Sequence, residues 1–144
     1  AEFGPRALGN RSLLADPRDK QVKSSMNYIK QRQNFRPFAP AILEEHADEI
    51  FDMPTKKSHY MQYVADCKYP DKYPGICHVD GTSRVQTVSE HSNPHFYKLL
   101  KEFYKKTGCP MLLNTSLNIK GKPIVNSWED GVAFTKKYGV KVYG

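Results

Sequence analysis

Basic side chains gather in the first forty residues of the chain and could bind an anion together. This segment holds eight Lys and Arg against three Asp and Glu. The cations that could converge on one site are Arg6, Arg11, Lys30, Arg32 and Arg36. Arginine grips phosphate or carboxylate oxygens in pairs with its planar fork, and lysine acts as a mobile point charge. The alternative is a scatter of surface cations whose stems cover apolar groups.

A second candidate site is the polar run at residues 114–118, directly after the apolar residues 110–113. Ligands of open α/β sheets bind where strands end. Hydroxyl and amide groups at such a place can bind phosphate oxygens or a small planar amide-like group. The alternative is an Asx or Ser turn that closes the strand.

Cysteine and histidine spacing does not predict a metal centre. His59, Cys67, Cys77 and His78 could be brought together on paper, but the chain has no C-x-x-C pair of the kind typical of structural zinc sites. We therefore predict no metal site, and we interpret the cysteines as buried thiols. A catalytic pair of Cys77 with a histidine has no support in the spacing.

Composition limits the class of protein. The chain has 144 residues, of which 39% are hydrophobic and 26% charged, and its formal net charge is +7. These values are typical of one folded domain and exclude a disordered or low-complexity chain. We expect no membrane span, because no apolar run approaches about 18 residues. The odd number of cysteines indicates a reducing cytoplasm.

The net charge predicts an anionic partner, which could be nucleic acid, a nucleotide, a small phosphate or an acidic surface. A solvated basic face is the alternative. Nine tyrosines and seven phenylalanines among the cations could stack on single-stranded nucleic acid. Since several of them fall on a helical stripe typical of a core, we do not expect a nucleic-acid partner.

Helix and strand patterns alternate along the chain, which predicts an α/β class, with α+β as the alternative. The clearest helix begins with Asn93 as its cap and ends at Gly108. Its core stripe should consist of Phe96, Leu99, Leu100, Phe103 and Tyr104. Further helices are expected over 20–32, 44–51 and 127–137. Strands are expected over 35–43, 59–67, 84–88, 110–114, 124–125 and 140–143.

Six segments resemble the C-terminal domain of O-carbamoyltransferases of the NodU/CmcH type. They are EFGPRALGNRSLLADPR at 2–18, KQR at 30–32, FRPFAP at 35–40, DGTSRVQTV at 80–88, LLNTSLN at 112–118 and GKPIV at 121–125. The resemblance spans nearly the whole chain, and the opening motif is long and specific. A mild departure is Leu117, where an aromatic residue is common in the family.

This resemblance implies a single YrdC-like domain over residues 1–144, with a twisted mixed sheet flanked by helices, cut from a longer chain. It also implies an activity, the use of carbamoyl phosphate and ATP, with Mg²⁺, to make carbamoyl adenylate. The expected partner is an N-terminal actin/hsp70-like domain of the same parent chain, which holds a metal and passes the carbamoyl group to a hydroxyl.

The family motifs also imply roles for single residues. Arg6, Lys30 and Arg36 would hold carbamoyl phosphate and the transferring phosphates. Ser116 and Asn118 would orient the carbamoyl group or the α-phosphate, and Arg84 would bind the ATP phosphates. The expected catalytic residues are Lys30, Arg36 and Ser116, and the expected binding residues are Arg6, Arg32, Arg84, Thr115 and Asn118.

Two other functions remain open at this point. A non-catalytic nucleotide- or RNA-binding module would show binding that weakens steeply with salt and depends little on Ser116. An interaction domain would serve only to dock the N-terminal half, and an exposed apolar patch would be its sign.

Overall fold

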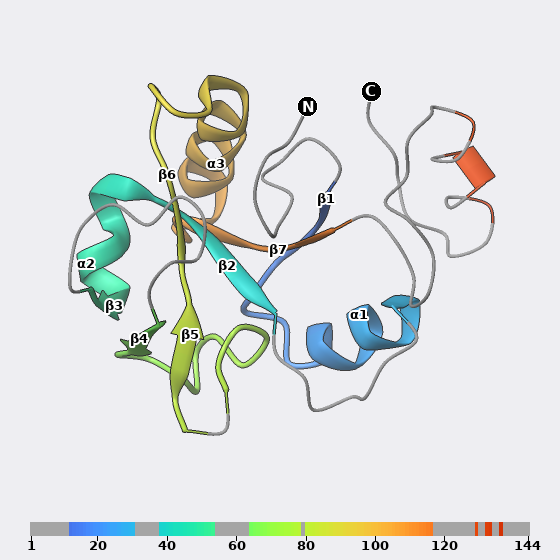
Figure 1. Ribbon diagram of the computed structural model, residues 1–144, viewed down its shortest axis with the longest axis horizontal. Coiled ribbons are helices and arrows are strands. Elements are labelled where there is room, and N and C mark those ends of the chain that lie inside the picture. The colour runs from blue at the N-terminus through green and yellow to red at the C-terminus, as the bar shows by residue number, and fades with distance from the viewer. Residues whose placement is uncertain are drawn as a thin grey trace.

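The computed structural model describes residues 12–30, 38–53, 64–78 and 80–116, together with Glu129, Val132, Ala133 and Lys136. The described part combines helices with two β-sheets, which confirms the mixed α/β class (Figure 1). Its elements are β1 (Ser12–Ala15), α1 (Val22–Lys30), β2 (Ala39–Leu43), a 3₁₀ helix (Glu44–His46), α2 (Ala47–Ile50), β3 (Phe51–Asp52), β4 (Val64–Cys67), β5 (Thr82–Arg84), β6 (Gln86–Val88), α3 (Pro94–Thr107) and β7 (Met111–Ser116).

The larger sheet has four strands in the order β1-β7-β2-β6. β7 is antiparallel to both of its neighbours, whereas β2 and β6 are parallel, so the sheet is mixed as predicted. The smaller sheet is antiparallel, with the order β3-β4-β5. Val85 alone separates β5 from β6, so one stretch of chain contributes a strand to each sheet.

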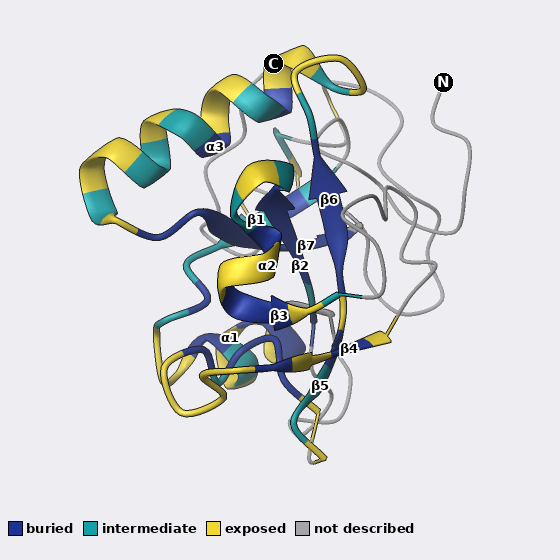
Figure 2. Cartoon of the chain, turned by 90° about the vertical axis from the view of Figure 1, so that its left-hand side faces the viewer, coloured by how far each residue is buried: buried dark blue, intermediate teal, exposed yellow. Residues whose placement is uncertain are grey.

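Helices cover both faces of the larger sheet. α3 packs on one face, which we call the α3 face, and its apolar layer consists of Leu43, Val88, Phe96, Leu100 and Leu112. α1 packs on the opposite face, the α1 face, whose layer includes Leu13, Val22, Met26, Ile42, Met111 and Leu113. Figure 2 shows β2, β6 and β7 mostly buried and the outer side of α3 exposed. Side chains alternate between the faces of a strand, so each strand of the sheet contributes to both layers.

α3 begins and ends where the sequence predicts. The Asn93 side chain accepts a hydrogen bond from the Phe96 backbone N–H at 3.2 Å, and Gly108 ends the helix with a φ of 74°. The predicted core stripe is correct for Phe96 and Leu100 but wrong for Leu99, which is 47% exposed. Leu99 follows Phe96 by three residues, which is a rotation of about 300° around the helix axis, or about 60° short of a full turn. It therefore lies at the edge of the stripe.

Several other expectations are partly confirmed. The helix expected over 20–32 is α1, and the strand expected over 35–43 is β2, although residues 31–37 lie outside the described part. The helix expected over 44–51 is interrupted, since Phe51 already pairs with Cys67 in β3. The strand expected over 84–88 begins earlier and divides at Val85 between the two sheets. The strands expected at 124–125 and 140–143 lie outside the described residues.

β1 was not predicted. Residues 12–15 carry no alternating pattern, and their extended conformation follows from antiparallel pairing with β7. Within the part of the chain that the structure describes, no helix is long and apolar enough to span a bilayer.

Candidate functional site

β7 carries residues 114–116, the first part of the polar run of the second candidate site, and strand alternation divides them between two faces. Thr115 is paired with Leu13 and buried on the α1 face. Asn114 is paired with Ala39 and buried on the α3 face. Backbone position 116 shares the parity of position 114, so the predicted site residues Thr115 and Ser116 occupy opposite faces of the sheet.

The buried carboxamides of Asn114 on β7 and Gln86 on β6 contact each other over β2, the strand between them, on the α3 face. Asn114 Nδ2 donates to Gln86 Oε1 at 2.7 Å. The register pairs Asn114 with Ala39 and Gln86 with Ala41, so the amides meet diagonally above two small side chains. Gln86 and Asn114 are 0% and 1% exposed. The alanines leave the space that the two amides fill.

The Gln86 amide has a donor to spare. Its Nε2 is buried and has no hydrogen-bond acceptor among the described residues. A buried donor without an acceptor costs about 1–3 kcal/mol, and such groups often mark a place where a ligand or water binds. Gln86 is therefore a candidate binding residue that the sequence analysis did not identify. The only sequence signal was its position inside the DGTSRVQTV segment.

Arg84 extends this polar region toward solvent. It ends β5, and its side chain is exposed. Alternation along 84, 86 and 88 places it on the side of the sheet that carries Gln86 and Val88. Because β2 and β6 are parallel, position 84 lies toward Ala39, whose partner on β7 is Asn114.

The α3 face therefore has an apolar part and a polar end. α3 covers the apolar part, and Arg84, Gln86, Asn114 and backbone position 116 make up the polar end. The arrangement presents a permanent cation at the edge of two buried amides. Such a set can bind a phosphate oxygen and a planar amide-like group side by side.

The remaining predicted residues are described in part or not at all. Lys30 is the last residue of α1, and its backbone lies one turn beyond Met26, which packs on the α1 face. Its side chain lies outside the description, as does that of Ser116. The predicted residues that fall wholly outside the described ranges are Arg6, Arg32, Arg36 and Asn118.

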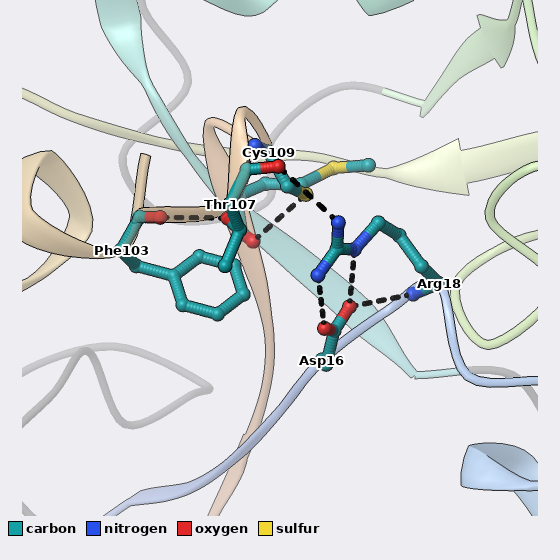
Figure 3. Close-up of polar contacts among 6 residues, drawn as sticks. Asp16, Arg18, Phe103, Thr107 and Cys109 are labelled. Carbon is teal, nitrogen blue, oxygen red and sulfur yellow. Dashed lines mark hydrogen bonds and ion pairs between the residues drawn. The ribbon is translucent and has the colours of Figure 1, made fainter. Parts of the chain in front are cut away.

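One basic residue of the N-terminal segment is used for structure. The Arg18 guanidinium grips the Asp16 carboxylate at 2.7 Å and 3.0 Å (Figure 3). It also donates to the Thr107 carbonyl oxygen at 3.3 Å, and it lies 6.0 Å from the centre of the Phe103 ring. A cation at a helix C-terminus satisfies a free carbonyl and stabilises the helix dipole. The side-chain hydrogen bond with Arg18 lowers the pKa of Asp16 below its ordinary value.

Comparison with known proteins decides the family. The family model "Carbamoyltransferase C-terminus" matches residues 1–143. The chain belongs to this family. Nodulation protein NolO of Bradyrhizobium diazoefficiens is 46% identical over 137 residues, which are 92% of this chain and 25% of that protein.

Two further relatives show the same proportions. Nodulation protein U of Azorhizobium caulinodans is 46% identical over 124 residues, 85% of this chain and 22% of that protein. An uncharacterized protein of Methanocaldococcus jannaschii is 44% identical over 133 residues, 91% of this chain and 22% of that protein. The chain thus spans about a quarter of the length of these relatives.

Proposed function

We propose that this carbamoyltransferase C-terminal domain binds carbamoyl phosphate and ATP and forms carbamoyl adenylate. The observation that carries the proposal is the polar end of the α3 face, where Arg84 borders the buried amides of Gln86 and Asn114. The substrates together carry about six negative charges, so bound cations must offset their repulsion. The amides match the planar carbamoyl group in size and hydrogen-bonding capacity.

Atom balance divides the reaction into two steps. Carbamoyl phosphate loses its phosphate to water and leaves carbamate. A carbamate oxygen then attacks the α-phosphorus of ATP, a new oxygen–phosphorus bond forms, and pyrophosphate leaves. Positioning and charge stabilisation can supply most of the rate enhancement for such a transfer. Mg²⁺ would accompany the ATP phosphates.

Each group has a role in this proposal. Arg84 binds ATP phosphate oxygens, and Gln86 Nε2 donates to a carbamoyl oxygen. Arg6, Lys30 and Arg36 keep the role that the family motifs imply, which is to hold carbamoyl phosphate and the transferring phosphates. Ser116, at the end of β7, and Asn118 orient the carbamoyl group or the α-phosphate, and Thr115 is a further binding residue. Arg32 is the remaining expected phosphate ligand.

The decisive experiment is exchange of labelled pyrophosphate into ATP by the intact protein, with and without carbamoyl phosphate. We expect exchange that requires carbamoyl phosphate. Arg84→Ala should raise the apparent KM for ATP roughly tenfold to a hundredfold, the effect of losing one charge-assisted hydrogen bond. Lys98→Ala, an exposed cation on α3, is the matched control and should leave exchange unchanged.

The contrary results are equally specific. An intact protein that binds ATP but catalyses no exchange would leave only a nucleotide-binding module. Binding of RNA that weakens steeply with salt would identify that module as a polynucleotide binder. Transfer of the carbamoyl group to a hydroxyl, the second half of the proposed activity, belongs to the expected N-terminal actin/hsp70-like domain.

A further inference from the structure

Two cysteines meet on the buried side of the smaller sheet. The register of β4 and β5 places Ala65 opposite Ser83, and Cys67 lies two residues further along β4 and is buried on the same face. The Ser83 hydroxyl donates to the Ile76 carbonyl oxygen at 2.8 Å and lies 3.8 Å from Cys77 Sγ. Cys67 and Cys77 belong to the same buried cluster, and each thiol shifts the pKa of the other.

Backbone hydrogen bonds hold both cysteines in place. The Cys67 N–H donates to the Gly81 carbonyl oxygen at 3.0 Å, and the His78 N–H donates to the Thr82 carbonyl oxygen at 2.8 Å. The loop over 68–76 therefore leaves β4 and returns beside β5, which brings Cys77 back to the strand pair that holds Cys67. This contact joins a strand to the loop that follows it.

The surroundings of Cys77 favour its thiolate. The Cys67 thiol lowers the pKa of Cys77 to about 7, against the opposing effect of burial. The charge of Lys23 lowers it further, and Lys23 Nζ also donates to the Cys77 carbonyl oxygen at 3.2 Å. The Cys77 thiol in turn raises the pKa of Cys67. The pair therefore ionises first at Cys77, and the thiolate is the form that attacks disulfides.

We propose that Cys67 and Cys77 form a reversible disulfide and are a thiol–disulfide exchange site of this chain. The oxidant is a small disulfide such as glutathione disulfide. The Cys77 thiolate attacks one of its sulfurs, a mixed disulfide forms, and one glutathione thiolate leaves. Cys67 then loses its proton and attacks the Cys77 sulfur, which releases the second glutathione. The two cysteines give up two electrons and two protons, and one disulfide becomes two thiols.

Burial limits the access of the oxidant to the two thiols. Cys67 and Cys77 are 8% and 5% exposed, so exchange proceeds when the loop over 68–78 opens. The loop carries several exposed polar and aromatic side chains, among them Lys68, Tyr69 and Lys72. The inference does not depend on the proposed activity, because it uses none of the residues to which that activity is assigned.

Cys109 is the internal control. It is also buried, and its Sγ lies 3.4 Å from the Met111 carbonyl oxygen. Burial raises the pKa of its thiol. It should therefore react with glutathione disulfide more slowly than Cys77.

The test treats the intact protein with glutathione disulfide and follows its thiols by peptide mass mapping. We expect Cys67 and Cys77 to disappear together into one cross-linked peptide, which dithiothreitol separates again, while Cys109 stays reduced. The rate should rise from about pH 6 to about pH 8 with the ionisation of Cys77. Cys109→Ser should retain the cross-link, and Cys67→Ser should stop at glutathione bound to Cys77.

Two results would overturn the inference. One is a protein whose Cys67 and Cys77 stay reduced under conditions that modify Cys109. The other is glutathione on both cysteines with no cross-linked peptide. Both are read from the unsubstituted protein, so the conclusion does not depend on whether the serine variants fold.

Discussion

The hydrogen bond between Asn114 and Gln86 is a polar contact beside an apolar layer, and each amide depends on the other. Both side chains are buried almost completely. Removal of one amide leaves the other without that partner, and a buried polar group in this state costs about 1–3 kcal/mol. The spare donor of Gln86 adds to the cost of the pair. A group kept at such a cost in the native protein is a good candidate for a functional role.

A double-mutant cycle measures this dependence. Asn114→Ala and Gln86→Ala should each lower the free energy of unfolding by about 2–3 kcal/mol, because packing is lost and the remaining amide loses this hydrogen bond. The double variant should lose less than the sum, with a coupling of about 1–2 kcal/mol. Urea unfolding gives the three values, with Lys98→Ala as the surface control. Simple additivity would contradict direct coupling of the two amides.

At the scale of the element, α3 is stabilised by a side chain at each end. Asn93 accepts from the Phe96 N–H at the start, and Arg18 donates to the Thr107 carbonyl at the end. Arg18 comes from the segment between β1 and α1, so the second contact also ties that segment to α3. The Asp16 carboxylate holds the guanidinium in place.

Acid titration tests the end held by Arg18. The lowered pKa of Asp16 means that its contribution to stability is present above the ordinary value of 3.8 and is lost as the pH falls through the lower folded value. Both side chains are more than a third exposed, so Arg18→Met should cost only about 1 kcal/mol near pH 7. The difference from the native protein should shrink below about pH 4. Thermal unfolding across this range supplies the measurement, and a constant difference would contradict the ion-pair explanation.

Local signals predicted α3 well and the site only in part. Asn93, Pro94 and Gly108 specify the ends of the helix through contacts within a few residues. The contact of Gln86 with Asn114 depends instead on the register of three strands, and no short stretch of sequence contains that information. The family motif identified Thr115 and Ser116 as neighbours in sequence, but strand alternation places these positions on opposite faces. The same lack of local signal explains why β1 was missed.

At the scale of the whole molecule, the excess positive charge has more than one use. Arg18 stabilises a helix end, and Lys23 donates to the Cys77 carbonyl oxygen. These cations are engaged within the protein, which reduces the number available to a polynucleotide. Arg84 is exposed beside the buried amides, where a small phosphate compound could reach it. The exposed position of Arg84 beside the amides therefore suits the small-molecule proposal.

The packing of distant parts converges on Gly75. A Cβ at this position would overlap Cγ1 of Val22 in α1, and the Gly75 carbonyl accepts from the Phe38 N–H at 3.2 Å. The loop over 68–78 therefore approaches α1 more closely than any side chain at position 75 permits. This contact joins the loop, α1 and the segment that enters β2.

Substitution of Gly75 tests that close approach. Gly75→Ala should lower the free energy of unfolding by about 1–3 kcal/mol through overpacking. Val22→Ala alone should also destabilise the protein, because it removes buried methyl groups. In the double variant the space left by Val22 receives the new methyl group, so the loss should be smaller than the sum. Gly81→Ala, at a φ of 82° with open space around it, serves as the comparison, because its cost comes from the backbone and Val22→Ala should not relieve it. Urea unfolding measures the losses of stability. If the losses add up for Gly75→Ala with Val22→Ala just as they do for Gly81→Ala with Val22→Ala, Gly75 is required for reasons other than its contact with α1.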